Sequence, residues 1–265
     1  MHRDRIATLI VFALCFIGSG TALAAADCLA MAEGPARVRN AAFSPAALEA
    51  DQVKLSFIGH ATFLIESPEG VRIATDYTGY AGGVLPDVVT MNRAHRSHYT
   101  DTPQSDIKHV LRGWNPDGGP VRHDLQVEDV RIRNVTTDIR GSYVGRVPDG
   151  NSIFIFEIAG LCIGHLGHLH HELSPEHLAL IGRLDIVMVP VDGGYTMAQV
   201  NMMNVVKELK ARLVIPMHYF GPTTLARFVE GAKASLQVEV SQSPTIVVSA
   251  ASLPDRPKLL VLPGH

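Results

Sequence analysis

Short apolar runs follow one another closely from residue 53 onward and are separated by polar turns. Their high content of β-branched residues predicts strands at 53–58, 62–66, 71–75, 88–91, 130–135, 152–158 and 161–164. The Ser-Pro-Glu-Gly segment at 67–70 has the composition of a tight turn. The first half of the chain is therefore expected to form a series of strands with short connections.

In the second half of the chain, apolar runs alternate with segments of helical periodicity. The nearly continuous run at 185–191 predicts a buried strand, and further strands are expected at 212–217, 245–249 and 258–262. Ser174 followed by Pro175 is typical of a helix start, and residues 196–199 have the pattern of a capping box before a second helix. A third amphipathic helix is expected at 225–232. This alternation predicts an α/β fold with two sheets and helices outside them.

The N-terminal segment has the pattern of an export signal. A basic start is followed by an apolar run at 6–18 and by Ala-Leu-Ala at 22–24, which is typical of a cleaved signal peptide. An uncleaved membrane anchor is the alternative, but the run is short for a bilayer span, so no stable anchor is expected. We therefore expect a signal peptide at 1–24, an Ala-rich tail at 25–50 and one folded domain at 51–265, in a periplasmic or secreted protein.

Two cysteines, Cys28 and Cys162, remain after such a signal is removed. Export makes a disulfide between them chemically possible. Cys162 lies in an apolar run, where a lone buried cysteine behaves as a small hydrophobic residue, and Cys28 lies in the weakly patterned tail. We therefore expect no bridge.

Composition limits the class of partner. The 265-residue chain has 46% hydrophobic residues, which suits one domain with a sizeable core. It carries 23 Lys and Arg against 26 Asp and Glu, for a formal net charge of −3. Nucleic-acid-binding proteins typically carry a basic surface, so no nucleic acid is expected as a partner. The oligomeric state is left open.

Histidines gather at the ends of predicted strands. His95, His98 and Asp101 follow the strand at 88–91 at intervals of three residues, which on a helical turn would share one face. Two imidazoles and a carboxylate suit zinc, manganese or iron. The alternative for this segment is a solvated polar turn.

Two further strand ends carry histidine. Four histidines follow the strand at 161–164, namely His165, His168, His170 and His171, and one or two of them are expected to point into a site. His218 follows the strand at 212–217, where a single histidine is more often bonded to backbone than to a metal. Because imidazole is the commonest protein ligand of zinc, the recurrence at several strand ends predicts a metal site.

Two aspartates also end strands. Asp76 follows the strand at 71–75, and Asp192 follows the strand at 185–191. An aspartate in this position can accept a hydrogen bond from a ligand histidine and fix its tautomer. The alternative role for both is the start of a turn.

In this order, the strand-end motifs resemble those of the metallo-β-lactamase superfamily, in the branch of lactonase-like and phospholipase-D-like hydrolases. The resemblance covers about 53–228, and its most specific segments are 59–66, 73–79, 95–101, 151–157, 165–171, 185–194 and 215–219. It implies a four-layer αββα sandwich that holds one or two metal ions, usually zinc, with manganese or iron as alternatives. It also implies a small-molecule substrate attacked by metal-activated water.

The resemblance implies a role for each candidate residue. The expected metal ligands are His95, His98, Asp101, His168 and His218, and Asp76 and Asp192 are expected to support them. Asp101 is also the candidate proton acceptor. His60 or His171 is expected to stabilise an oxyanion or protonate a leaving group.

The chain departs from the family pattern at three places. Thr102 stands where the first motif ends in histidine, and 136–138 reads Thr-Thr-Asp where a further ligand histidine is usual. His168 stands where a carboxylate normally bridges two metals. We therefore expect an exported hydrolase of esters, lactones or phosphodiesters, with a catalytically impaired metal-binding or sensory protein as the alternative.

Overall fold

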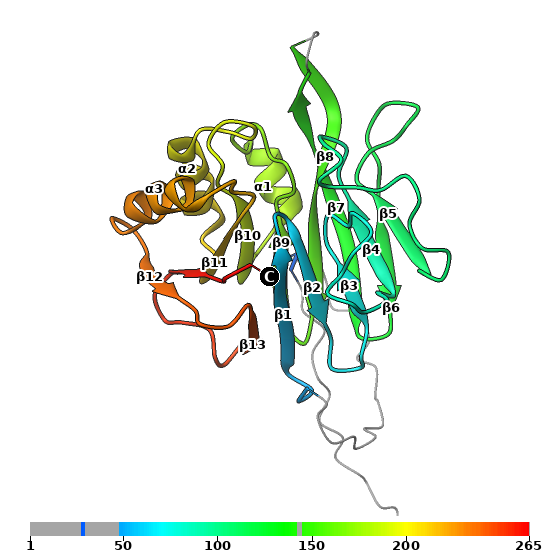
Figure 1. Ribbon diagram of the computed structural model, residues 1–265, viewed down its shortest axis with the longest axis horizontal. Helices are drawn as coiled ribbons and strands as arrows, with labels where there is room; N and C mark the ends of the chain where they lie inside the picture. Colours follow the sequence, from blue (N-terminus) through cyan, green and yellow to red (C-terminus); the bar gives the residue numbers. More distant parts are fainter. Residues whose placement is uncertain (1–27, 30–47, 142–144, 265) are drawn as a thin grey trace, which may run out of the picture.

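Two β-sheets face each other in the computed structural model, which describes residues 28–29, 48–141 and 145–264 (Figure 1). The six-stranded sheet has the order β13 (Thr245–Ser249), β1 (Gln52–Gly59), β2 (Thr62–Glu66), β3 (Arg72–Ala74), β4 (Val88–Met91) and β5 (His109–Arg112). The eight-stranded sheet has the order β12 (Gln237–Val240), β14 (Lys258–Val261), β11 (Leu213–Met217), β10 (Ile186–Pro190), β9 (Leu161–His165), β8 (Arg146–Ile158), β7 (Val130–Arg140) and β6 (Asp124–Val127).

The main core lies between the two sheets. It contains Phe57 and Phe63 from the six-stranded sheet and Phe154 and Phe156 from the eight-stranded sheet, all at most 2% exposed. Alternate residues of each strand face this core, because side chains of a strand point to opposite sides of the sheet in turn. Burial of apolar area on this scale dominates the stabilisation of the sandwich.

Three helices lie in the described part of the chain: α1 (Pro175–Ile181), α2 (Gln199–Leu209) and α3 (Pro222–Ala232). They lie together on the eight-stranded sheet (Figure 1), where a second core contains Met202 and Val206 of α2. On the opposite side, loop residues such as Tyr77 and Ile107 cover the six-stranded sheet. The predicted α/β sandwich is present, but loops replace one of its four layers within the described ranges. No helix in those ranges is long and apolar enough to cross a membrane.

The helix starts confirm one prediction and correct another. Ser174 caps α1, with Pro175 in its first turn, as the sequence predicts. The predicted capping box at 196–199 is wrong, because α2 begins only at Gln199 and its N-cap, Ala198, makes no side-chain bond. The hydroxyl of Thr196 instead donates to Asp192, and the amide of Gln199 donates to the carbonyl oxygens of Val191 and Thr224. Tertiary partners have therefore replaced the local cap.

A disulfide joins Cys28 to Cys162, so the expectation of two unpaired cysteines is wrong. Cys28 is not loose: its side chain is 2% exposed, and its carbonyl accepts a hydrogen bond from the backbone of Arg183 at 2.9 Å. Both cysteines belong to the core beneath the helices. The two residues are 134 positions apart, so no local pattern could indicate their contact. The predicted signal peptide and most of the predicted tail lie outside the described residues.

Strand direction places the functional segments at one edge. Strands β9, β10 and β11 are parallel, as are β3, β4 and β5. Strand β1 runs in the same direction as β3, because both are antiparallel to β2. Within each sheet, the carboxyl ends of these strands therefore point the same way, as in other α/β proteins that carry their sites at strand ends.

Candidate metal centre

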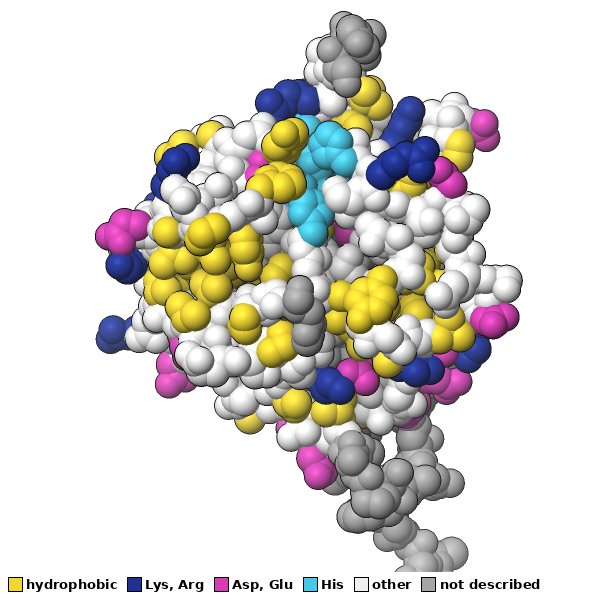
Figure 2. All heavy atoms as spheres, viewed as in Figure 1, with side chains coloured by type: hydrophobic (Ala, Val, Ile, Leu, Met, Phe, Trp, Pro, Cys, Tyr) yellow, Lys and Arg dark blue, Asp and Glu magenta, His cyan; other side chains and the backbone are white. Residues whose placement is uncertain are grey.

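Three histidines from both sheets meet at this edge. His60 follows β1, His98 lies in the loop after β4, and His218 follows β11. Each offers one ring nitrogen, and these atoms all lie within 4.8 Å of one another. Figure 2 shows histidine side chains gathered at one place on the surface, beside hydrophobic side chains. The arrangement has the number and type of ligand atoms that a transition-metal ion requires.

Two carboxylates hold the Nδ1 atoms of two of these histidines. Asp76 Oδ2 lies 2.5 Å from His98 Nδ1, and Asp192 Oδ2 lies 3.0 Å from His218 Nδ1. An ionised carboxylate only accepts, so each Nδ1 carries the proton and each Nε2 keeps its lone pair. The two Nε2 atoms face each other at 2.9 Å. Two lone pairs at this distance repel unless a cation joins them, so this donor set fits a metal ion.

The carboxyl group of Asp76 is fully buried beyond the end of β3. Asn92 Nδ2 donates to its Oδ1 at 2.9 Å, while His98 binds its Oδ2. Burial raises the pKa of Asp76, but His98 and His165 together with these hydrogen bonds outweigh that effect and hold the pKa below its usual value. Asp76 is therefore ionised and lies where it can fix the tautomer of His98.

The carboxyl group of Asp192 organises the loop after β10. Its Oδ1 accepts hydrogen bonds from the backbone N–H groups of Gly194 at 2.8 Å, Tyr195 at 2.5 Å and Thr196 at 3.1 Å. Burial raises the pKa of Asp192, but its bonds to His218, to the Thr196 hydroxyl and to these N–H groups hold the pKa below its usual range. The same carboxylate therefore shapes the loop and orients His218.

His60 completes the group of three. Its Nε2 is buried and has no hydrogen-bond partner among the described residues, which is the state of a free ligand atom. Burial, followed by the neighbouring His218 and His98, lowers the pKa of His60 to about 4, so its ring is neutral near pH 7. His60, Asp76 and His218 all have positive φ angles of 40–55°. Such backbone angles are costly in non-glycine residues and cluster at functional sites.

His168 lies beside this group, and the other three histidines of its segment lie farther from the group. The ring centroid of His168 is 4.8 Å from those of both His98 and His218. His170 lies behind it, with Nε2 2.5 Å from His168 Nδ1. His165 is a structural residue, because its Nε2 lies 2.8 Å from the carbonyl oxygen of Ala61.

Three predicted site residues do not join the group. His95 is exposed and lies outside the group of three, with its ring centroid 4.8 Å from that of His168. The side chain of Asp101 is 65% exposed and pairs with Arg96 at 3.3 Å. His171 contacts the backbone of Asp138 and Glu172 instead. The segment after β4 is irregular rather than helical, so residues three apart do not share one face.

Sequence reasoning did not single out Asn92, Arg140 or Phe220. Asn92 directly follows β4, so the strand-end argument that found Asp76 could have found it. Arg140 ends β7 and donates to the carbonyl oxygens of Gly194, Tyr195 and Thr196, a contact with no local signal. Phe220 is 62% exposed, with its ring 5.3 Å from that of His60 and 5.4 Å from that of His218.

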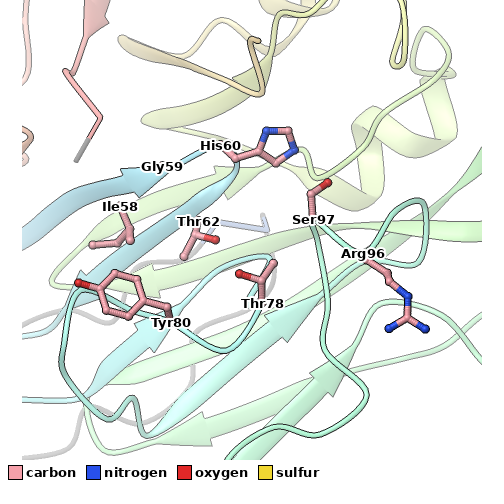
Figure 3. A pocket seen from close by; sticks show the side chains of 8 residues that line it. All are labelled: Ile58, Gly59, His60, Thr62, Thr78, Tyr80, Arg96 and Ser97. Carbon is pink, nitrogen blue, oxygen red and sulfur yellow. The ribbon is translucent and has the colours of Figure 1, made fainter.

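A pocket of about 300 Å³ opens beside His60 (Figure 3). Its walls come from the end of β1, the segment after β3 and the loop after β4, and its lining residues are Ile58, Gly59, His60, Thr62, Thr78, Tyr80, Arg96 and Ser97. The lining combines an aromatic ring, hydroxyl groups and one cation. It therefore suits a small molecule that has apolar and polar parts.

Residues 54–218 match the family described as the β-lactamase superfamily domain. This match covers more than half of the chain, so the chain belongs to that superfamily. The resemblance inferred from the strand-end motifs and the predicted α/β sandwich class are both confirmed.

Similar proteins indicate the same class. A UPF0173 metal-dependent hydrolase of Pyrococcus abyssi is 28% identical over 191 residues, which cover 63% of this chain and 84% of the relative. Another, from Thermococcus onnurineus, is 29% identical over 194 residues, with the same shares of the two chains. A solved structure from Thermotoga maritima, whose description assigns it to the metallo-β-lactamase superfamily, is 27% identical. It matches 80% of this chain and 100% of its own, with a TM-score of 0.59. These relatives support a metal-dependent hydrolase.

Proposed function

We propose that this protein hydrolyses a small ester, lactone or phosphodiester with a metal ion held by His60, His98 and His218. The observation that carries the proposal is the pair of carboxylate-backed histidines whose Nε2 atoms face each other at 2.9 Å. When bound, a divalent metal ion polarises the substrate oxygen and lowers the pKa of a water molecule. Asp76 and Asp192 keep the two imidazoles in the tautomer that offers lone pairs.

The surroundings of the group support a small substrate with an apolar part. Tyr195 and Phe220 are 60% and 62% exposed, and their rings lie 5.2 Å apart beside the histidines. Exposed aromatic rings bind apolar groups and exclude water from a reacting bond. The pocket beside His60 offers room for the other part of the substrate, with Arg96 at its edge. The net charge of −3 favours a small molecule over nucleic acid.

Zinc is the metal that we propose. Neutral imidazoles suit zinc and iron, whereas manganese prefers carboxylate and water oxygens. Both aspartates of the site already accept hydrogen bonds from the protein, and Asp101 lies outside the group. The donor set therefore favours zinc or iron over manganese.

Export is also part of the proposal. The basic and apolar pattern at 1–24 supports a signal peptide. The Cys28–Cys162 disulfide supports an oxidising compartment, because such bridges persist mainly in exported proteins. N-terminal sequencing of the protein from the periplasm or medium tests this proposal. A chain that retains residues 1–24 and has free thiols at Cys28 and Cys162 would contradict it.

Elemental analysis tests the metal centre. The purified protein is expected to carry zinc, His218→Ala is expected to lose it, and His109→Ala on the edge strand β5 should retain it. A panel of lactones, esters and phosphodiesters then tests hydrolysis by the loaded protein. A protein that retains zinc but hydrolyses none of them would favour the metal-binding or sensory alternative. A native protein without metal, unchanged in stability by His218→Ala, would refute the metal centre.

A further inference from the structure

The hydrogen bonds behind His168 differ from those behind the other histidines. Its Nδ1 lies 2.5 Å from Nε2 of His170. The backbone N–H of Arg140 donates to the opposite nitrogen of His170, Nδ1, at 2.9 Å, and the Arg140 Nε–H approaches the same atom at 3.4 Å. No carboxylate takes part in this chain of contacts.

These contacts determine where the protons lie. A backbone N–H can only donate, so His170 Nδ1 is an acceptor and carries no proton. A neutral imidazole carries its single proton on the other nitrogen, so His170 Nε2–H donates to His168 Nδ1. His168 Nδ1 therefore also lacks a proton. The proton of His168 must then lie on its Nε2.

The ring that carries this N–H group packs against the histidine group. His168 Nε2 is buried and has no hydrogen-bond partner among the described residues. The His168 ring packs at 4.8 Å, centroid to centroid, from each of His95, His98 and His218. A buried donor without a partner destabilises the fold, so its retention points to a ligand that accepts from it.

We infer that His168 is not a metal ligand but a hydrogen-bond donor to the substrate oxygen on which negative charge develops during hydrolysis. The inference rests on the proposed hydrolytic function. His98 and His218 offer lone pairs to a cation, whereas His168 offers an N–H to an anion from the adjoining position. No proton leaves His168 in this role, because the neutral imidazole only shares its Nε2–H with the oxyanion. His170 and Arg140 act as positioning residues that maintain this tautomer.

The tautomer can be measured without metal or substrate. Protein labelled with ¹⁵N-histidine gives two-bond ¹H–¹⁵N correlations that distinguish protonated from bare ring nitrogens, and the pattern missing in His168→Gln assigns His168. We expect a protonated Nε2 and a bare Nδ1. A protonated Nδ1 would overturn the inference, whether or not the protein proves to be a hydrolase. In His170→Phe, which offers His168 Nδ1 no donor, His168 is expected to become a mixture of tautomers. An unchanged ¹⁵N pattern would show that His170 does not set the tautomer of His168.

Zinc titration and kinetics then separate a donor from a ligand. His168→Leu should bind zinc with the affinity of the native protein, whereas His98→Ala should bind it at least about 100-fold more weakly. On a substrate that the panel identifies, kcat of His168→Leu should fall by about 10²–10³-fold with KM little changed. His168→Gln, which retains an N–H donor, should recover part of this loss. Equal loss of zinc in His168→Leu and His98→Ala would show that His168 is a ligand.

Discussion

His98 and His218 on one side of the candidate centre differ from His168 on the other in what binds Nδ1. Nδ1 of His98 and of His218 lies 2.5 and 3.0 Å from a carboxylate oxygen of Asp76 and Asp192, whereas Nδ1 of His168 faces Nε2 of His170. Histidine therefore has two different roles here, because the partner of Nδ1 determines whether Nε2 offers a lone pair to a metal ion or an N–H to an acceptor. A count of histidines does not reveal this difference.

The two sides should respond differently to loss of the groups behind them. The largest effect is expected for the aspartates. Asp76→Asn or Asp192→Asn removes the charge that holds Nδ1–H, so zinc affinity should fall by about 10–100-fold. Calorimetric zinc titration measures this fall, with Asp87→Asn, outside the centre, as the control. Native zinc affinity in both variants would show that the aspartates do not prepare His98 and His218 as metal ligands.

A smaller effect, restricted to turnover, is expected from His170→Gln. The amide can orient either its N–H or its oxygen towards His168, so the N–H of His168 is held less firmly. We expect kcat to fall by about tenfold while zinc affinity remains native, because one hydrogen bond to the positioned group contributes about 1–1.5 kcal/mol. Matched kinetics and zinc titrations measure both quantities. A loss of zinc affinity instead would place His170 on the ligand side.

Arg140→Gln tests how far the two sides are independent. The backbone N–H of Arg140 remains, so the tautomers of His170 and His168 should not change. The guanidinium bonds to the 194–196 loop are lost, which loosens the loop that Asp192 shapes. Zinc affinity should fall by about fivefold, corresponding to about 1 kcal/mol for such bonds. A changed His168 tautomer would show that the side chain of Arg140, and not its backbone N–H, sets the tautomers of His170 and His168.

The last effect concerns the pH dependence of stability, and it involves His60 beside the two ligand histidines and His170 behind His168. The pKa values of His60 and His170 are lowered from 6.5 to about 4, mainly because both rings are buried. Between these values the unfolded chain binds more protons than the folded one, so the stability of the metal-free protein should fall as pH drops from about 6.5 towards 4. Urea unfolding at several pH values measures this slope. His60→Gln and His170→Gln should each flatten it, and His109→Gln should not.

Much of the fold could be predicted from local pattern. The strands that precede Asp76, Asp192 and His218 are clear apolar runs, and their ends were placed within a few residues. The start of α1 at Ser174 was equally local. The start of α2 was misplaced, because Thr196 and Gln199 bond to distant partners rather than to the helix.

The candidate site was predictable only in part. Strand ends indicated His98 and His218, because parallel strands bring their carboxyl ends to one edge. Asp101 was expected there from its spacing, but an irregular loop turns it outward to Arg96. The disulfide was missed because 134 residues separate its cysteines.

The sequence by itself determined the strands, the polar residues that end them and hence the superfamily, because strands and strand-end motifs depend on residues that are neighbours along the chain. Only the tertiary structure decided which nitrogen of each histidine faces the centre. That choice depends on Asp76, Asp192 and His170. The two aspartates lie up to 26 residues from the histidines that they contact, and His170 is held by the backbone of Arg140 on β7. Hydrogen-bond partners across a sheet edge, rather than residue type, thus separate the ligands from the donor.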